Sequence, residues 1–182
     1  MVVVVWLSSA IEQLRKQSTR VVVVARLRRR RVFEGNREKE MSDEATRYEA
    51  FEKRMHEEYP KMFSKPYGGF AIGEGWWPII SDLCSHIQQH IDWINFNIDK
   101  YPERGVEPVE QVVVAQIKEK FGGLRFYYDG GDAYVRGLVE MAESWAGRTC
   151  EICGERGTRG GDGWISTLCP THRAERDEAR NK

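Results

Sequence analysis

The sequence predicts an α+β protein, in which amphipathic helices pack on a small antiparallel β-hairpin or sheet. Two observations lead to this fold class. Apolar residues recur at steps of three and four over long segments of the chain, which is typical of helices that bury one face. Between two such segments, β-branched and aromatic residues flank a Gly-Gly pair, which is typical of a β-hairpin and not of a parallel βαβ unit.

Two long helices are expected in the first half of the chain. The first covers about residues 42–63, because Ser42 and Asp43 are favourable N-cap residues and an apolar repeat follows them. The second starts near Pro78, which suits the first turn of a helix, and ends before Pro102. Its apolar stripe is the longest in the sequence.

A third helix is expected after the hairpin. Asp132 is placed to cap its start and Gly147 to end it. The stripe expected to be buried between these limits consists of Val135, Leu138, Val139, Ala142 and Trp145.

The segment VVVAQIKEKFGGLRFYYDGGD, residues 112–132, predicts the hairpin, with Gly122-Gly123 as its two turn residues. This register places Lys120 opposite Arg125 and Lys118 opposite Tyr127. The face toward the helices would hold Ile117, Phe121, Leu124, Phe126 and Tyr128, with Glu119 as an exception. The opposite face would hold Lys118, Lys120, Arg125 and Tyr127.

This basic face has two interpretations. Like charges directly opposite one another are unfavourable, so the face needs either anionic neighbours or an anionic partner. In the first case it is a solvated face neutralised by nearby acidic residues. In the second case its lysines contact a nucleic-acid backbone while Tyr127 stacks on a base.

The pair Trp76-Trp77, between Gly75 and Pro78, also has two interpretations. The two indole rings either fasten this loop into the core or form an exposed anchor for a protein partner.

Four residues near the end of the chain have the spacing of metal ligands. Cys150 and Cys153 form one pair, Cys169 and His172 form another, and 15 residues separate the pairs. Three thiolates and one imidazole fill the tetrahedral coordination of one Zn²⁺ ion, which is typical of structural sites and leaves no position open for substrate. A disulfide would leave His172 unexplained.

The residues around these ligands predict a treble-clef-like module. Gly154 allows the turn that presents the first pair, and GTRGGDGWIST predicts a turn with short strands. The second pair is expected at the start of a polar helix over about residues 170–180.

The charge of the chain is unevenly distributed. Residues 1–40 carry ten Lys and Arg against four Asp and Glu, whereas the remaining residues carry 18 against 24. We interpret residues 1–40 as a disordered or wrongly assigned extension, with translation starting at Met41; a basic arm that binds an anionic surface is the alternative. The expected division is therefore 1–40, an α+β body over 41–147, and a zinc-binding module over 148–182.

The sequence offers no catalytic site. Asp82, His86 and His90 stand four residues apart and can share a helix face, but the Glu that a metalloprotease motif requires is absent. Cys84 lies on an apolar stripe, where a cysteine behaves as a small buried hydrophobe. No apolar run is long enough to span a membrane, and no small-molecule substrate is indicated.

Three motifs resemble a family of small bacterial and bacteriophage proteins of unassigned activity. They are GEGWWPIISDLCSHI, QIKEKFGGLRFYYDGG and AESWAGRTCEICG…GWISTLCPTH, and they cover about residues 73–172. The resemblance implies the same four metal ligands and the Gly122-Gly123 turn, and it adds no catalytic residue.

The function expected from these observations is non-catalytic binding of another macromolecule by a zinc-stabilised protein. The first hypothesis is a cytoplasmic, phage- or prophage-encoded protein that acts on a host protein. The alternative is a nucleic-acid-binding or regulatory zinc-finger protein that uses the basic hairpin face. The third is a metal-dependent hydrolase or nuclease based on His86 and His90.

Overall fold

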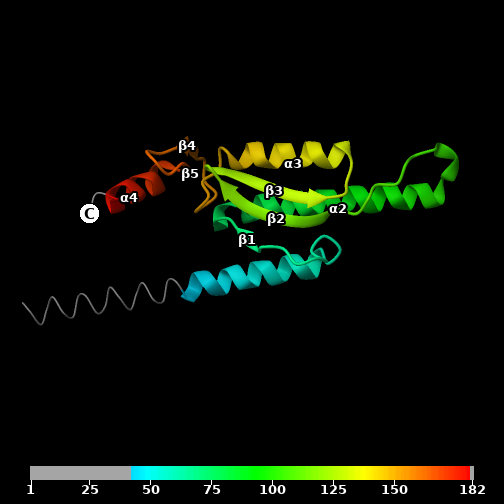
Figure 1. Ribbon diagram of the computed structural model, residues 1–182, viewed down its shortest axis with the longest axis horizontal. Coiled ribbons are helices and arrows are strands. Elements are labelled where there is room, and N and C mark those ends of the chain that lie inside the picture. Colours follow the sequence, from blue (N-terminus) through cyan, green and yellow to red (C-terminus); the bar gives the residue numbers. More distant parts are fainter. Residues whose placement is uncertain (1–41, 181–182) are drawn as a thin grey trace, which may run out of the picture. The chain divides into compact units, whose positions relative to one another are not determined.

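The computed structural model describes residues 42–180 (Figure 1). The chain divides into two compact units, residues 1–47 and 48–182, and only the first turns of one helix are described in the first unit. The interpretation of residues 1–40 lies outside the described residues. All further description concerns residues 48–182, apart from the start of that helix.

The α+β prediction is confirmed. After a helix over residues 42–58, the elements in chain order are β1 (Phe70–Ala71), a 3-10 turn (Glu74–Trp76), α2 (Trp77–Lys100), a 3-10 turn (Pro102–Arg104), β2 (Val113–Lys120), β3 (Gly123–Asp129), α3 (Ala133–Ala146), β4 (Thr158–Gly160), β5 (Ser166–Leu168) and α4 (Pro170–Arg180). One sheet has the order β1-β2-β3, with β1 parallel and β3 antiparallel to β2. The second sheet is the antiparallel pair β4–β5.

The first helix ends at residue 58, so the prediction of about 42–63 is wrong at its C-terminal end. Pro60 explains the difference, because proline has no N–H to continue a helix and restricts the residue before it. The chain then turns, and the carbonyl of Met62 accepts a hydrogen bond of 2.8 Å from the N–H of Val114 at the start of the hairpin.

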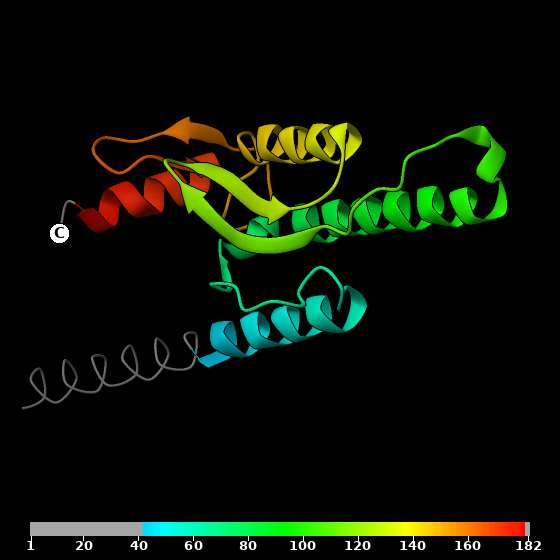
Figure 2. The same cartoon turned by 45° about the vertical axis from the view of Figure 1, so that its right-hand side comes forward.

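The main core lies between this helix, α2, α3 and the three-stranded sheet. α2 and α3 run side by side, and α3 also lies against β3 (Figures 1 and 2). The largest fully buried side chains include Trp76, Phe70, Met55, Ile87 and Leu124. Cys84 is fully buried as well, and burial raises the pKa of its thiol.

α3 begins as predicted, with Asp132 as its N-cap. One carboxylate oxygen accepts a 3.0 Å bond from the N–H of Val135, and the other lies 2.9 Å from Nε2 of His90 on α2. Burial alone would favour the protonated acid, but these bonds to the carboxylate lower the pKa of Asp132. The cap therefore also joins the start of α3 to the middle of α2.

The expected burial of α3 is wrong at one position. Val135, Val139 and Ala142 are buried, but Trp145 is 56% exposed and Ala146 is fully buried instead. A stripe that follows the helical period from Val135 reaches Ala146 after three turns, which leaves Trp145 at its edge. Gly147 ends the helix as expected, with its N–H bonded to the carbonyl of Glu143.

The dual role of Asp132 gives a testable expectation. Asp132→Ala removes both the cap and the bond to His90, and should lower the free energy of unfolding by about 1–2 kcal/mol. Asp132→Asn keeps an equally good cap and should retain most of that stability. Urea unfolding of the three proteins at neutral pH measures the difference, and equal stability of the Ala and Asn variants would contradict the capping role.

The hairpin register differs from the prediction. Lys120 pairs with Gly123 and Lys118 with Arg125, so the turn residues are Phe121 and Gly122. Both have positive φ, 53° and 73°, as a type I′ turn requires. The side chain of Glu119 fixes this turn, because its Oε1 accepts a 2.5 Å bond from the N–H of Gly122.

The corrected register changes the position of Phe121 but keeps the two faces. Phe121 leaves the apolar face for the turn, where it is 64% exposed. Ile117, Leu124 and Phe126 remain buried on the apolar face. Lys118 and Lys120 remain on the opposite face, with Lys118 now directly across from Arg125.

Candidate metal centre

Cys150, Cys153, Cys169 and His172 lie together, with all four ligand atoms within 4.8 Å of one another. The Sγ atoms of Cys153 and Cys169 are 3.8 Å apart, and Nδ1 of His172 lies 3.5 Å from Sγ of Cys150 and 3.2 Å from Sγ of Cys169. Ligands at tetrahedral angles, with Zn–S of about 2.3 Å and Zn–N of about 2.0 Å, are about 3.8 Å (S to S) and about 3.5 Å (S to N) apart. The donor atoms are therefore positioned to hold one metal ion.

The first pair of ligands lies in a tight loop after α3. Gly154, with φ of 80°, donates its N–H to the carbonyl of Cys150 at 2.9 Å and closes this loop. Burial of Cys150 opposes its ionisation, but the N–H groups of Cys169, Cys153 and Ile152 point at its sulfur and lower its pKa to about 6. The loop thus favours a thiolate, which is the form that binds metal.

The pKa of the Cys153 thiol shifts in the opposite direction, because two other thiols lie close to it. The N–H of Glu155 favours its thiolate, but desolvation and the nearby thiols of Cys150 and Cys169 together raise its pKa. Several negative charges in one small volume repel one another unless a cation neutralises them. This is the electrostatic arrangement expected of a metal centre.

The second pair of ligands joins β5 to α4. Cys169 follows β5 directly, and His172 lies in the first turn of α4. The Nδ1 atom of His172 faces the thiols, while its Nε2 lies 4.0 Å from the carboxylate of Glu175. This separation is longer than a hydrogen bond, so Glu175 places a negative charge behind the ring without holding it in position.

Three arginines attach α4 to the loop and strands before it. α4 buries no residue of its own. Arg173 donates to the carbonyls of Gly160 and Thr158 at 3.0 and 2.5 Å, and Arg180 donates to the carbonyl of Asp162 at 2.7 Å. Arg176 donates to the hydroxyl of Ser166. The helix that carries His172 is therefore held by hydrogen bonds instead of an apolar core.

Buried contacts connect the metal-ligand loop with the rest of residues 48–182. Nε1 of Trp76 donates a buried 2.7 Å bond to the carbonyl of Thr149, next to the first ligand. The N–H of Gly75 donates to the carbonyl of Glu151 at 3.0 Å. At the hairpin turn, the hydroxyl of Thr167 donates to the carbonyl of Gly122 at 2.5 Å. Disruption of the metal site should therefore also destabilise the core.

The two tryptophans that the sequence singled out belong to the core. Trp76 is fully buried. Trp77 is partly buried and stacks on Phe51, with ring centroids 4.6 Å apart and nearly parallel planes. Neither ring is placed as an exposed anchor.

The side chains of the basic hairpin face lie together, but they differ in whether another side chain of the protein already pairs with them. Arg125 forms a 3.2 Å ion pair with Glu143 of α3, whose other oxygen accepts the N–H of Phe126. Lys118 lies over the ring of Tyr127, with Nζ 5.3 Å from the ring centroid. Lys120 is exposed at the end of β2.

Asp82, His86 and His90 are not brought together as metal ligands. His90 is bonded to Asp132, as described above. Within residues 42–180, the Cys150–His172 cluster is the only group of three or more possible ligands. Every helix in the same range is too short or too polar to span a lipid bilayer.

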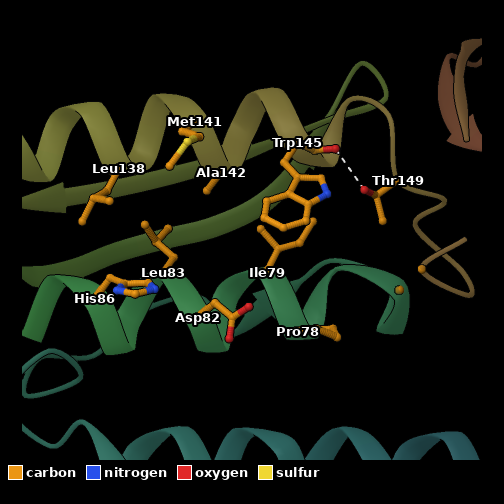
Figure 3. A pocket seen from close by; sticks show the side chains of 12 residues that line it. Pro78, Ile79, Asp82, Leu83, His86, Leu138, Met141, Ala142, Trp145 and Thr149 are labelled. Carbon is orange, nitrogen blue, oxygen red and sulfur yellow. Dashed lines mark hydrogen bonds between the residues drawn. The ribbon is translucent and has the colours of Figure 1, made fainter. Parts of the chain in front are cut away.

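A groove between α2 and α3 is the feature that sequence reasoning missed. Its volume is about 290 Å³, and Figure 3 shows side chains of both helices around it. The apolar lining includes Ile79, Leu83, Leu138, Met141, Ala142 and Trp145. Met141 is 61% exposed and Trp145 is 56% exposed, whereas Asp82 and His86 add polar groups from α2. A strict helical period from Val135 would have placed Trp145 outside the buried stripe.

Comparison with protein-family models, with curated proteins and with solved structures finds no match for the chain.

Proposed function

We propose that this is a non-catalytic, zinc-stabilised protein that binds a segment of another protein in the groove between α2 and α3. The observation that carries the proposal is the exposure of Met141 and Trp145 at an apolar groove. Large apolar side chains gathered at a concave surface are typical of binding sites, and Trp is enriched among residues that dominate binding energy.

Zinc is the metal that best suits the cluster. Three thiolates and one imidazole favour zinc among the common divalent ions, and four protein ligands leave no coordination position for substrate. A loop with two ligands, a β-hairpin, and a helix that carries the last ligand follow one another in the order of a treble clef. These features support a structural role for the ion.

The polar groups of the groove indicate the chemistry of the partner. The Asp82 carboxylate is exposed and makes no hydrogen bond or ion pair with the described residues. A Lys or Arg of the partner would pair with Asp82 and contact the face of Trp145, while an aliphatic side chain fills the space beside Met141. The partner segment is therefore apolar with at least one cation.

We propose a host protein in the bacterial cytoplasm as the source of this segment, because three motifs of the chain resemble small bacterial and bacteriophage proteins. Within residues 42–180, Asp82, His86 and His90 do not form a group of possible metal ligands and His90 pairs with Asp132, so the structure adds no support for a hydrolase or nuclease.

Photo-crosslinking in bacterial cells tests the proposal. Benzoylphenylalanine at position 141 is expected to give a discrete protein adduct, and the same residue at position 134 is the control. Tyr134 lies on the same helix and is similarly exposed, at 55%, but does not line the groove. Adding Trp145→Ala or Asp82→Asn should reduce the adduct at position 141. Equal adducts at both positions, or an adduct that survives both substitutions, would refute the groove as the binding site.

A further inference from the structure

A continuous row of aromatic and cationic side chains follows the exposed face of the hairpin to its turn. It starts at Tyr127 and Lys118 and continues through Lys120 to Phe121. Nζ of Lys120 lies 5.7 Å from the centroid of the Phe121 ring. We call this row, with Trp164 described below, the hairpin track.

The turn of the hairpin meets the loop between β4 and β5. Lys120, Phe121 and Trp164 border one hollow of about 280 Å³. Trp164 is 72% exposed, Phe121 64% and Tyr127 41%, so three aromatic rings of the hairpin track face solvent. Arg159 fixes the turn, because its Nε donates a 2.6 Å bond to the carbonyl of Phe121. The track therefore joins the hairpin to the metal-ligand module.

The charges along the hairpin track are positive. Lys118 and Lys120 form no ion pair with a carboxylate among residues 42–180. Two acidic side chains nearby are already engaged: Glu119, which also lines the hollow, accepts the N–H of Gly122, and Glu143 pairs with Arg125. Arg125 lies directly opposite Lys118 and is already paired with Glu143, so the cations left for an anionic partner are Lys118 and Lys120.

We infer that the hairpin track binds single-stranded nucleic acid. Its lysines would contact phosphates, and Trp164, Phe121 and Tyr127 would stack on unpaired bases, which is how sequence-tolerant single-strand binders combine charge and aromatic rings. A duplex keeps its bases stacked within the helix and offers only phosphates to these rings. This inference is independent of the groove, which lies between α2 and α3 and has different lining residues.

Fluorescence anisotropy with the full-length, zinc-loaded protein tests the inference. The probes are labelled oligothymidylate and oligouridylate about 20 nucleotides long, with a duplex of the same length as comparison. Both single strands are expected to bind more tightly than the duplex at about 50 mM salt and to lose affinity steeply as salt rises. Binding of only one of the two would identify DNA or RNA as the ligand.

Two variants separate the roles of charge and stacking. Lys118→Gln/Lys120→Gln should weaken binding about tenfold and lower the slope of log K against log salt by about 1.4, at about 0.7 per phosphate contact. Trp164→Ala should weaken binding about tenfold without changing that slope, and the quenching of protein fluorescence by the oligonucleotide should decrease. Lys53→Gln/Lys65→Gln is the matched control, since it removes two charges from exposed positions outside the track.

Several outcomes would overturn the inference. The first is that neither single strand binds. The second is that the duplex binds as tightly as the single strands, and the third is that the control variant loses as much affinity as Lys118→Gln/Lys120→Gln. Trp145→Ala should leave oligonucleotide binding unchanged. If the crosslink at position 141 is found but no oligonucleotide binds, the proposed function stands and the inference about the hairpin track fails.

Discussion

Cys153→Ser is expected to abolish metal binding and to unfold the region from Cys150 to α4. Binding of structural zinc contributes on the order of 10 kcal/mol at neutral pH, which is comparable to the whole stability of a typical domain. Cys153 is the most informative ligand to replace, because it is exposed and its loss removes little packing. Thermal unfolding followed by circular dichroism, together with zinc analysis of the same samples, measures the effect.

Cys84→Ala is the control for this experiment. It removes a buried thiol that takes no part in the cluster, so zinc content should not change and stability should fall by only about 1 kcal/mol. A Cys153→Ser protein that melts within a few degrees of the wild type would contradict a stabilising role for the metal.

Gly75→Ala is expected to have the second largest effect, at about 3 kcal/mol or more. A Cβ at Gly75 would lie 2.1 Å from the carbonyl oxygen of Cys150 and 2.5 Å from the backbone nitrogen of Gly154. Both are backbone atoms of the loop that presents the first two ligands, so they cannot rotate away as a side chain can. The substitution should therefore separate this loop from the start of α2 and weaken metal binding.

Gly137→Ala is the matched control, because a Cβ there has no neighbour within 4 Å. Gly137 lies within α3, where alanine favours the helix by about 0.5–1 kcal/mol relative to glycine. The two Gly→Ala changes should thus have opposite signs in urea unfolding. Equal stability of the Gly75→Ala protein and the wild type would show that the close packing of this loop is not needed.

Local chemistry made much of the fold and of the metal site predictable. The spacing of Cys150, Cys153, Cys169 and His172 indicated one tetrahedral cluster, and the structure brings these atoms together. Asp132 was recognisable as an N-cap because its role depends only on the three residues after it. Both predictions rest on local spacing and local chemistry, which the sequence shows directly.

Features fixed by distant residues were missed. The turn at Phe121-Gly122 depends on Glu119 and on the contact of Gly122 with Thr167, which the local Gly-Gly pattern does not show. The groove depends on how two helices far apart in the sequence lie against each other. Trp145 is a different case, because its position ten residues after Val135 is a local signal that places it at the edge of the buried stripe, and the prediction of its burial was wrong.

Native mass spectrometry of the protein, purified without chelator, tests the metal centre most directly. We expect one zinc ion bound to each wild-type chain and none bound to Cys153→Ser. A wild-type chain with free thiols and no metal, or a Cys153→Ser chain that retains its zinc, would contradict a structural Cys3His zinc site.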